Sequence, residues 1–346
     1  RQDWLSPDND VEQQVGDLDE FDGGEIRGLR FGAVGTFNFK RPWVYTVFAA
    51  TNAFDRGFGV TTTDEFDFLD YRIDIPLRKG SALSIGKQKE PISMERIMSL
   101  AFEPMQERAS VSDALLPSRN VGIVLNGTLA GQRVTHAFGV FNDWFDADED
   151  FDNGATQWVG RVTGLPLKSE DESALLHLGF GLRRTDAKAG LRFRTEPEFN
   201  MSPDFVDTGL FEADSAMTYS FEVSARKGPV WLAGEYLQTD VSAPAQGDPT
   251  FAGYHATASW IPTGEMRKYN KRGGTLGPVP VARPVNRGGW GTWELGARWS
   301  DLDLTDGAID GGEMQVLSLG VSWWPTPWAA FSVNYRDITL DRCDTT

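Results

Sequence analysis

Hydrophobic and polar residues alternate along most of this chain with a period of two. Within residues 26–37, Leu29 and Phe31 fall on one side, whereas Arg30 and Gly32 fall on the other. This period predicts β-strands with one apolar and one polar face. Fourteen such runs follow one another, and they are 26–37, 43–52, 69–75, 81–87, 121–125, 134–140, 158–163, 176–182, 217–225, 230–236, 254–260, 293–299, 317–323 and 329–335. The pattern therefore predicts an all-β protein.

The connections between these runs are of two kinds that alternate along the chain. Short ones are basic or neutral, such as NFKRP and PLRKGS, whereas long ones are acidic, such as NDWFDADEDFDNGA and SDLDLTDGAIDGGE. Short turns at one end and long loops at the other are typical of outer-membrane β-barrels. Two connections break the rule: 167–173 is short but partly acidic, and 262–289 is long where a short turn is expected.

Aromatic residues and hydropathy fit the same architecture. Trp residues recur near the predicted strand ends, where they would form girdles at the membrane interfaces. They are Trp43, Trp158, Trp260, Trp290, Trp293, Trp323, Trp324 and Trp328. No apolar run approaches the roughly 18 residues that a membrane helix requires. We therefore predict a transmembrane antiparallel β-barrel, with residues 1–346 as one domain. A soluble all-β protein is the alternative, but it would not be expected to separate its connections in this way.

The number of strands is expected to exceed the fourteen runs. The sequence opens on the fragment RQDW and closes on the polar tail DRCDTT, without a last strand that ends in an aromatic residue. We therefore expect an incomplete first and last strand, and a barrel of sixteen strands, an even number as in bacterial barrels.

One long connection, residues 90–118, combines apolar and cationic residues. It is too apolar for a solvated loop, so we expect it to fold into the barrel and constrict it. Five of its side chains are expected to pin it against the inner wall, namely Ile97, Met98, Leu100, Phe102 and Met105. Cations within the segment and beside it would then project into the lumen. They are Lys87, Lys89, Arg96, Arg108 and Arg119.

Strand parity assigns further charges to the lumen. The arginines on the polar faces of the strands are Arg30, Arg72, Arg161, Arg183 and Arg298. The carboxylates on the same faces are Asp70, Asp74, Glu222, Glu235 and Glu294. If these carboxylates pair with the arginines, the pore is polar but only weakly selective.

Composition excludes several other functions. A net charge of −17 argues against a nucleic-acid partner. The single cysteine, Cys343, excludes an internal disulfide, and three histidines do not support a zinc cluster. No cofactor is therefore expected. The acidic run 146–152 lacks the EF-hand pattern of a Ca²⁺ site and is expected to be a solvated loop. We find no Ser–His–acid spacing around His136, His177 or His255, so we predict no enzymatic activity.

Several motifs, in order, resemble the phosphate-selective porins O and P of Gram-negative outer membranes. The motifs are GKQKEPISMER, MQER and LPSRNVG within 86–122, RVTGLPL at 161–167, LRFRTEPE at 191–198, FVDTG at 205–209, GEYLQTDV at 234–241, SWIPTGEMRKY at 259–269 and WELGARWSDLDL at 293–304. The resemblance implies a trimer of sixteen-stranded barrels, each constricted by infolded loops and lined by arginines, with lysines near the constriction. It places the cations of 86–122 in the constriction loop, and Arg192 and Arg194 in an arginine-rich run.

The resulting hypothesis is a water-filled channel that selects phosphate or related small anions. Rings of Arg and Lys would replace part of the hydration shell of the anion with charge-assisted hydrogen bonds. On this hypothesis, replacement of Arg192 and Arg194 lowers the preference for anions. The expected surroundings are outer-membrane lipid and lipopolysaccharide, in a homotrimer. Two alternatives stay open: a general, weakly selective porin, and a structural or receptor barrel whose acidic loops bind a partner.

Overall fold

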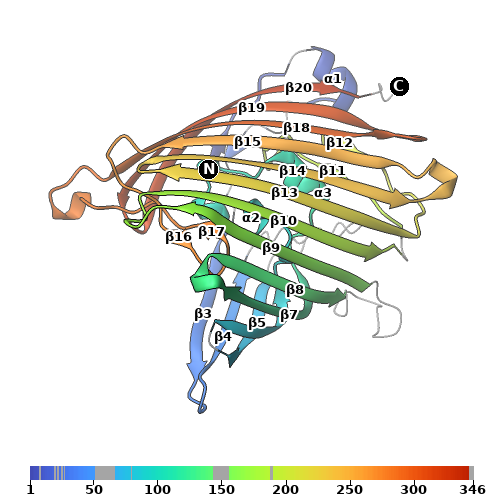
Figure 1. Ribbon diagram of the computed structural model, residues 1–346. Coiled ribbons are helices and arrows are strands. Elements are labelled where there is room, and N and C mark those ends of the chain that lie inside the picture. The colour runs from blue at the N-terminus through green and yellow to red at the C-terminus, as the bar shows by residue number, and fades with distance from the viewer. Residues whose placement is uncertain are drawn as a thin grey trace.

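The computed structural model describes residues 1–7, 9–18, 21, 23–24, 26, 28–50, 67–78, 80–142, 156–187 and 190–342. One antiparallel sheet of fourteen strands dominates it, and Figure 1 shows how strongly this sheet curves. In pairing order the strands are β3 Arg30–Phe37, β4 Trp43–Ala50, β5 Asp67–Arg78, β6 Ser81–Gln88, β7 Asn120–Leu129, β8 Val134–Asn142, β9 Thr156–Lys168, β10 Ala174–Asp186, β13 Ser215–Lys227, β14 Val230–Ser242, β15 Thr250–Trp260, β18 Thr292–Asp306, β19 Ile309–Thr326 and β20 Ala329–Asp341.

The strand pattern read from the sequence agrees with this sheet. Each of the fourteen alternating runs coincides with one strand, with ends that differ by a few residues. The expected count of sixteen is not confirmed. Within the described residues the pairing order starts at β3 and ends at β20, and no pair joins these two strands.

Three connections between neighbouring strands carry more than a single 3₁₀ turn. Between β6 and β7 lie α2 Met94–Ile97, the 3₁₀ turn η2 Leu100–Phe102 and α3 Ser110–Leu115. Between β10 and β13 lie β11 Arg194–Thr195 and β12 Val206–Asp207, which pair with each other. Between β15 and β18 lie β16 Tyr269–Asn270, β17 Thr275–Leu276 and the 3₁₀ turn η5 Val285–Arg287. We call residues 90–118 the central segment and residues 267–277 the inward hairpin.

The remaining elements are short. They are β1 Gln2–Asp3 paired with β2 Gly23–Gly24, the helix α1 Asn9–Val15, and the 3₁₀ turns η3 Ala130–Gln132 and η4 Pro244–Gln246. Among the described residues, no helix is both long enough and apolar enough to cross a membrane.

The two faces of the sheet have opposite polarity, and the buried face is the polar one. On β13, Ser220 and Glu222 are buried, whereas Phe221 and Val223 are exposed. The same inversion recurs on the neighbouring strands, because an antiparallel sheet keeps the alternation in register. An apolar outer face around a polar interior is the arrangement that suits a lipid exterior.

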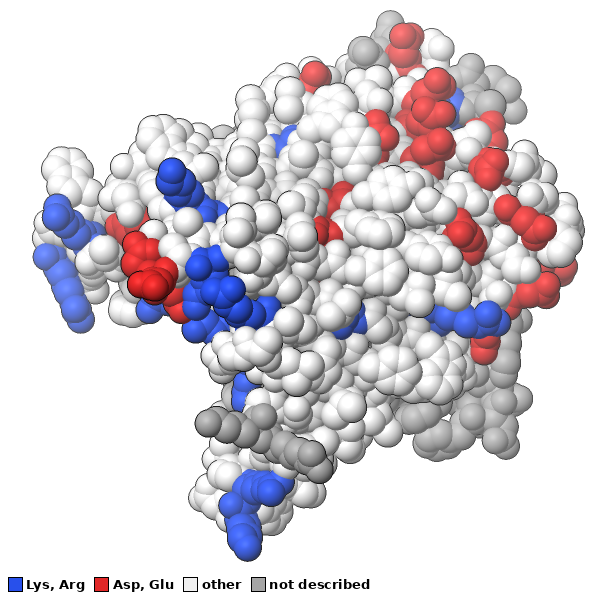
Figure 2. All heavy atoms as spheres, viewed as in Figure 1, with Lys and Arg blue, Asp and Glu red and all other residues white. Residues whose placement is uncertain are grey.

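Charge is distributed along the strand direction. In Figure 2 the acidic side chains gather mainly at the end where the strands meet the long connections, whereas the basic ones lie mainly at the opposite end and at the lower tip. A broad band between the two ends has few charges. The predicted acidic loops 52–66 and 142–155 lie almost entirely outside the described residues, as do Cys343 and the acidic run 146–152.

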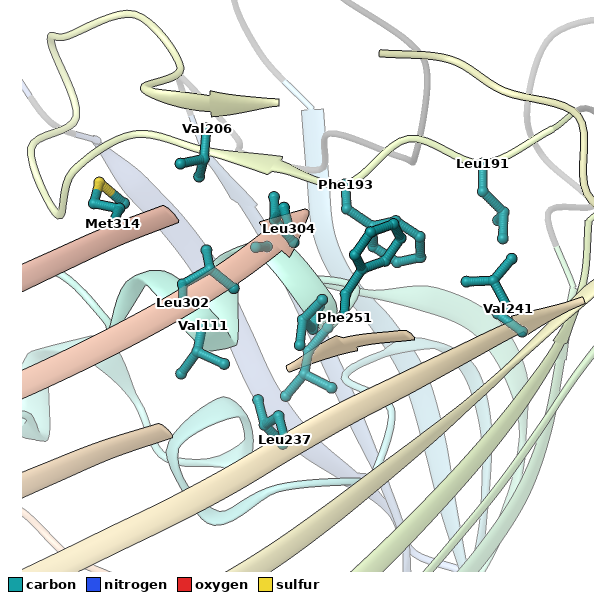
Figure 3. Packing of buried hydrophobic residues seen from close by; sticks show 14 of the residues in the cluster. Val111, Leu191, Phe193, Val206, Leu237, Val241, Phe251, Leu302, Leu304 and Met314 are labelled. Atoms are coloured by element: carbon teal, nitrogen blue, oxygen red, sulfur yellow. The ribbon is translucent and has the colours of Figure 1, made fainter. Parts of the chain in front are cut away.

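Toward the long-connection end, the interior is filled by an apolar core. Figure 3 shows Val111 of α3, Phe193 beside β11 and Val206 of β12 packed among inward side chains of the wall, such as Leu237 and Phe251. This core fixes the central segment and the β11–β12 hairpin against β14, β15, β18 and β19. Burial of each large side chain contributes about 1.5–3 kcal/mol.

The central segment is held by more side chains than the five expected. Met98 and Met105 are buried as expected, and Phe102 packs, partly buried, against the cluster that contains Met98. Ile97 and Leu100 instead face an internal cavity. Apolar side chains of the segment that were not anticipated are fully buried as well: Ile92, Met94, Ala109, Val111, Ala114, Leu115 and Leu116.

Candidate functional site

A cavity of about 580 Å³ lies inside the curved sheet. One side is formed by inward residues of β3–β9, and the other side by the central segment and the tip of the inward hairpin. Seven cationic side chains line it, against the two carboxylates of Asp70 and Asp74. The seven are Arg30, Arg72, Lys89, Arg108, Arg119, Arg161 and Arg272. This excess makes the cavity the strongest candidate for an anion site among the described residues.

Two cations of the cavity are held by backbone carbonyls. Lys89 donates from Nζ to the carbonyl oxygen of Met98 at 2.8 Å, and Arg108 donates from Nη2 to the same oxygen at 3.1 Å. This carbonyl belongs to Met98 at the C-terminal end of α2, where a helix leaves acceptors unsatisfied. Among the described residues, neither cation pairs with a carboxylate. No carboxylate contact among the described residues therefore cancels either charge at the cavity wall.

Burial and neighbouring cations act on Lys89. Its pKa lies well below the usual lysine value, first because burial penalises the ammonium, and then because Arg108, Arg119 and Arg96 repel it. An ammonium of this kind favours an anion nearby, which would restore part of the lost solvation.

On the strand side, the cavity arginines are partly neutralised. Arg119 lies 3.3 Å from Asp70, and Arg72 lies 3.2 Å from Asp74. Asp74 also accepts a hydrogen bond from Ser84 Oγ at 2.5 Å. Arg30 lines the cavity from β3 and is exposed.

Three arginines assigned to the lumen by parity do point inward, but each is buried and bound to a carboxylate. Arg183 Nε lies 2.7 Å from Glu90, and Arg161 Nε lies 2.7 Å from Glu222. Arg298 pairs with Glu95 and Glu198. Neither Arg183 nor Arg298 lines the cavity. Of these carboxylates, Glu222 was among the lumen positions assigned by parity, whereas Glu90, Glu95 and Glu198 come from connections between strands.

The carboxylates assigned to the lumen by parity are mostly paired with arginines. The pairs are Asp70–Arg119, Asp74–Arg72, Glu222–Arg161 and Glu294–Arg267. Glu235 instead accepts a hydrogen bond from the backbone N–H of Glu95 at 2.6 Å. The acidic lumen positions thus serve largely as fixed partners of arginines.

Four other cations that were expected in the pore lie outside the cavity, and they are Arg96, Lys87, Arg192 and Arg194. Arg96 is buried, pairs with Asp113 at 2.9 Å and donates to the carbonyl of Leu116, so it braces the central segment. Lys87 shares the outer side of β6 with Leu83 and Ile85, because its parity is opposite to that of Ser84, which lines the cavity.

The arginine-rich run forms the edge of the β11–β12 hairpin. Arg192 pairs with Asp207 at 2.5 Å, and Arg194 pairs with Asp204 at 2.9 Å. Asp207 raises the pKa of Arg192 through a hydrogen bond. Phe193 between them is buried in the apolar core. Alternation along the hairpin therefore turns both arginines away from that core and onto local carboxylates.

Sequence reasoning missed Arg272, which lines the cavity from the tip of the inward hairpin. The signal was present, because connection 262–289 is long where a short turn is expected. A connection of that length at the turn end of a barrel can fold inward, but the sequence does not state which of its cations reaches the lumen.

Comparison with known proteins agrees with the fold. The family model described as phosphate-selective porin O and P matches residues 6–345. An uncharacterized protein of Caulobacter vibrioides is 24% identical over 329 residues, which are 90% of this chain and 62% of that protein. The chain thus spans less than two thirds of the length of this relative.

Solved outer-membrane proteins share the fold at low identity. OmpT of Vibrio cholerae is 12% identical with a TM-score of 0.52, covering 91% of this chain and 80% of its own. The anion-selective porin of Comamonas acidovorans is 13% identical with a TM-score of 0.52, and the match covers 90% of this chain and 78% of that porin. Salmonella typhi OmpF, solved in complex with daunomycin, is 12% identical with a TM-score of 0.51, and the match covers 92% of this chain and 84% of OmpF.

Proposed function

The chain belongs to the phosphate-selective porin O and P family of the Gram-negative outer membrane, and we propose that it forms a water-filled channel that prefers small anions. The observation that carries this proposal is the cavity, where seven cationic side chains face two carboxylates. Lys89 and Arg108, which bind no carboxylate among the described residues, would exchange water around an anion for charge-assisted hydrogen bonds.

The acidic net charge of −17 does not oppose this preference. Acidic side chains gather mainly at the long-connection end of the sheet, and a smaller acidic group lies among the basic side chains at the opposite end. Charges farther than a Debye length, about 8 Å at physiological salt, are largely screened. Local cations therefore govern the potential at the cavity.

Phosphate and related oxyanions are the proposed solutes. The planar guanidinium of Arg binds two oxygens of one oxyanion, whereas the ammonium of Lys acts as a point charge. Arg108, Arg119 and Arg272 lie around one cavity with Lys89, so several weak contacts in series are available to a passing ion. Weak sites in series allow an ion to leave as readily as it enters.

Several architectural features belong to the same proposal. A closed barrel would join β3 and β20, which stand at the two ends of the pairing order among the described residues, and closure removes exposed strand edges. We propose closure with a sixteen-stranded count, with the central segment as the constriction, and assembly as a homotrimer in contact with outer-membrane lipid and lipopolysaccharide. We also propose passive permeation without catalysis: of the three histidines, His136 lines the cavity, whereas the buried His177 and His255 lie apart from it.

A general, weakly selective porin is the second candidate. It is favoured by the carboxylates that bind Arg161, Arg183 and Arg298, because these pairs remove three arginines from the charge available to an ion.

The reversal potential in a planar bilayer under a KCl gradient separates the two candidates. A chloride preference together with block by millimolar phosphate is the result expected for the anion channel. A reversal potential near zero without phosphate block would favour the general porin, and the absence of conductance would leave a structural or receptor barrel.

A further inference from the structure

We propose that Arg161 is a positioning residue, which fixes the inward hairpin so that Arg272 acts as a further selectivity-determining cation of the cavity. This inference rests on the proposed channel function, and it assigns different roles to two arginines that line the same cavity.

The hydrogen bonds of Arg161 leave its guanidinium little capacity for a passing anion. Nε and Nη2 bind the two carboxylate oxygens of Glu222 at 2.7 and 3.0 Å. Nη1 donates to the carbonyl of Gly273 at 2.7 Å, and Nη2 donates to that of Gly274 at 2.9 Å. The side chain is only 3% exposed. These four contacts use four of the five N–H groups, and two of them hold the hairpin.

The close approach of the hairpin to β9 requires the glycine at 274. Gly274 has φ +60°, in the left-handed region. A Cβ at this position would lie 2.8 Å from Thr163 Oγ1 and 3.2 Å from Arg161 Nη1. Only glycine lets the backbone reach the guanidinium without displacing it.

Other contacts anchor the base and body of the hairpin. Arg267 binds Glu294 at 2.7 Å and stacks over Trp231 at 5.4 Å. Tyr269 Oη lies 2.7 Å from His177 Nδ1. Leu276 packs in the buried cluster of Met94, Met98 and Trp231. The inward hairpin is thus tied both to the sheet and to the central segment.

Arg272 is the cation that this framework presents to the cavity. It lies in the turn directly before Gly273, where its exposed side chain lines the cavity. Among the described residues it has no ion-pair partner. Its neighbour Lys271 instead pairs with Glu172 at 3.0 Å. A shift of the two carbonyls that Arg161 holds would therefore displace Arg272.

The test is a double-mutant cycle on the chloride-to-potassium permeability ratio. We expect Arg272→Gln to lower the ratio about twofold, the effect of one charge roughly 8 Å from an ion in water. We expect Arg161→Gln to lower it by a similar factor, and the double variant to lower it no further. Effects that multiply would instead mean that Arg161 meets the ion independently, and would overturn the positioning role.

Conservative replacement adds a readout that separates charge from geometry. Arg161→Lys keeps the charge, but it cannot bind Glu222 and two carbonyls at once. We expect it to lose most of the selectivity that Arg161→Gln loses. Full selectivity in Arg161→Lys would contradict the proposal.

Paired variants guard against misfolding. Arg161→Gln removes the arginine that Glu222 binds and leaves this buried carboxylate with His177 Nε2 3.7 Å away, so Arg161→Gln/Glu222→Gln is measured alongside it. Arg194→Gln/Asp204→Asn is the matched control, because it removes a largely buried pair that touches neither the inward hairpin nor the cavity. The Arg161→Gln/Glu222→Gln variant should lower the chloride-to-potassium permeability ratio, and the control variant should leave it unchanged.

Thiol chemistry tests the placement of Arg272 independently of selectivity. In a Cys343→Ser background, Arg272→Cys should react with a small sulfonate-bearing methanethiosulfonate, and an ammonium-bearing reagent should restore the permeability ratio. Arg161→Gln should change the rate of this reaction. If the unmodified channel shows no anion preference while the rate still depends on Arg161, the proposed function fails and the positioning role stands. A rate independent of Arg161 overturns the positioning role.

Discussion

Arg298 and Glu95 form a buried ion pair, with Nη1 3.3 Å from Oε1, which joins the wall of the sheet to the central segment. Both side chains are at most 3% exposed. On its other side, Arg298 binds Glu198, which also accepts hydrogen bonds from Ser300 Oγ at 2.6 Å and Ser318 Oγ at 3.0 Å. One arginine therefore secures the central segment and the segment before β12 to β18.

Replacement of Arg298 by Met should release this attachment. Two carboxylates would lose their buried counter-charge, which costs about 3–5 kcal/mol when one partner of a buried pair is removed. We expect the temperature of conversion from the folded to the unfolded band in electrophoresis to fall, and single-channel conductance to rise as the central segment loosens. Arg184→Met, at an exposed position with Asp186 4.0 Å away, is the control. An unchanged conversion temperature in Arg298→Met would contradict this role.

Selectivity should depend on cavity arginines and not on the arginine-rich run. Arg108→Gln removes a cavity cation without a carboxylate partner, so we expect the chloride-to-potassium permeability ratio to fall about twofold. Arg192→Gln should leave the ratio unchanged, since Asp207 binds Arg192 outside the cavity. This outcome differs from the expectation drawn from the motif. If Arg192→Gln lowered the permeability ratio more than Arg108→Gln does, the arginine-rich run would lie in the path of the ion.

Channel selectivity should change with pH through Lys89. Burial, followed by repulsion from Arg108, holds the pKa of Lys89 well below 10.5. Its charge is therefore lost at a lower pH than that of an ordinary lysine, and the anion preference should fall as pH rises through this lowered value. Reversal potentials across a pH series would show this step. Lys89→Met should remove the step, whereas a step retained in that variant would place its origin elsewhere.

Stability should fall with rising pH through Glu103 of the central segment. Burial, followed by the charge of Glu95, raises the pKa of Glu103 from 4.5 to about 8. Between these values the folded state keeps a proton that the unfolded state has lost, so the unfolding free energy decreases by at most about 1.4 kcal/mol per pH unit. The contribution is fully present below 4.5 and is lost as pH rises through 8.

Urea midpoints at pH 5, 7 and 9 would measure this effect. Glu103→Gln mimics the protonated carboxyl group, so its urea midpoint should fall less with rising pH than that of the parent protein. The difference in urea midpoint between the two proteins should therefore grow with pH. Glu170→Gln, at an exposed turn, should follow the parent protein at each pH. Parallel curves for the parent and Glu103→Gln would show that Glu103 is not the titrating group.

The sequence by itself determined the sheet. Alternation with a period of two is a local property, and it located fourteen strands and put polar side chains such as Arg161 and Arg298 on the inner face. The separation of short basic connections from long acidic ones likewise follows from chain order, and it agrees with the charge distribution in Figure 2.

Only the tertiary structure decided which cations remain available to an ion. Parity shows that Arg161 and Arg183 face inward, but it cannot show that Glu222 and Glu90 meet them from segments 61 and 93 residues away. The same limit concealed Arg272, which reaches the cavity because Arg161 binds the carbonyls beside it. Ion pairs between distant segments depend on the path of the infolded connections, and no local pattern encodes that path.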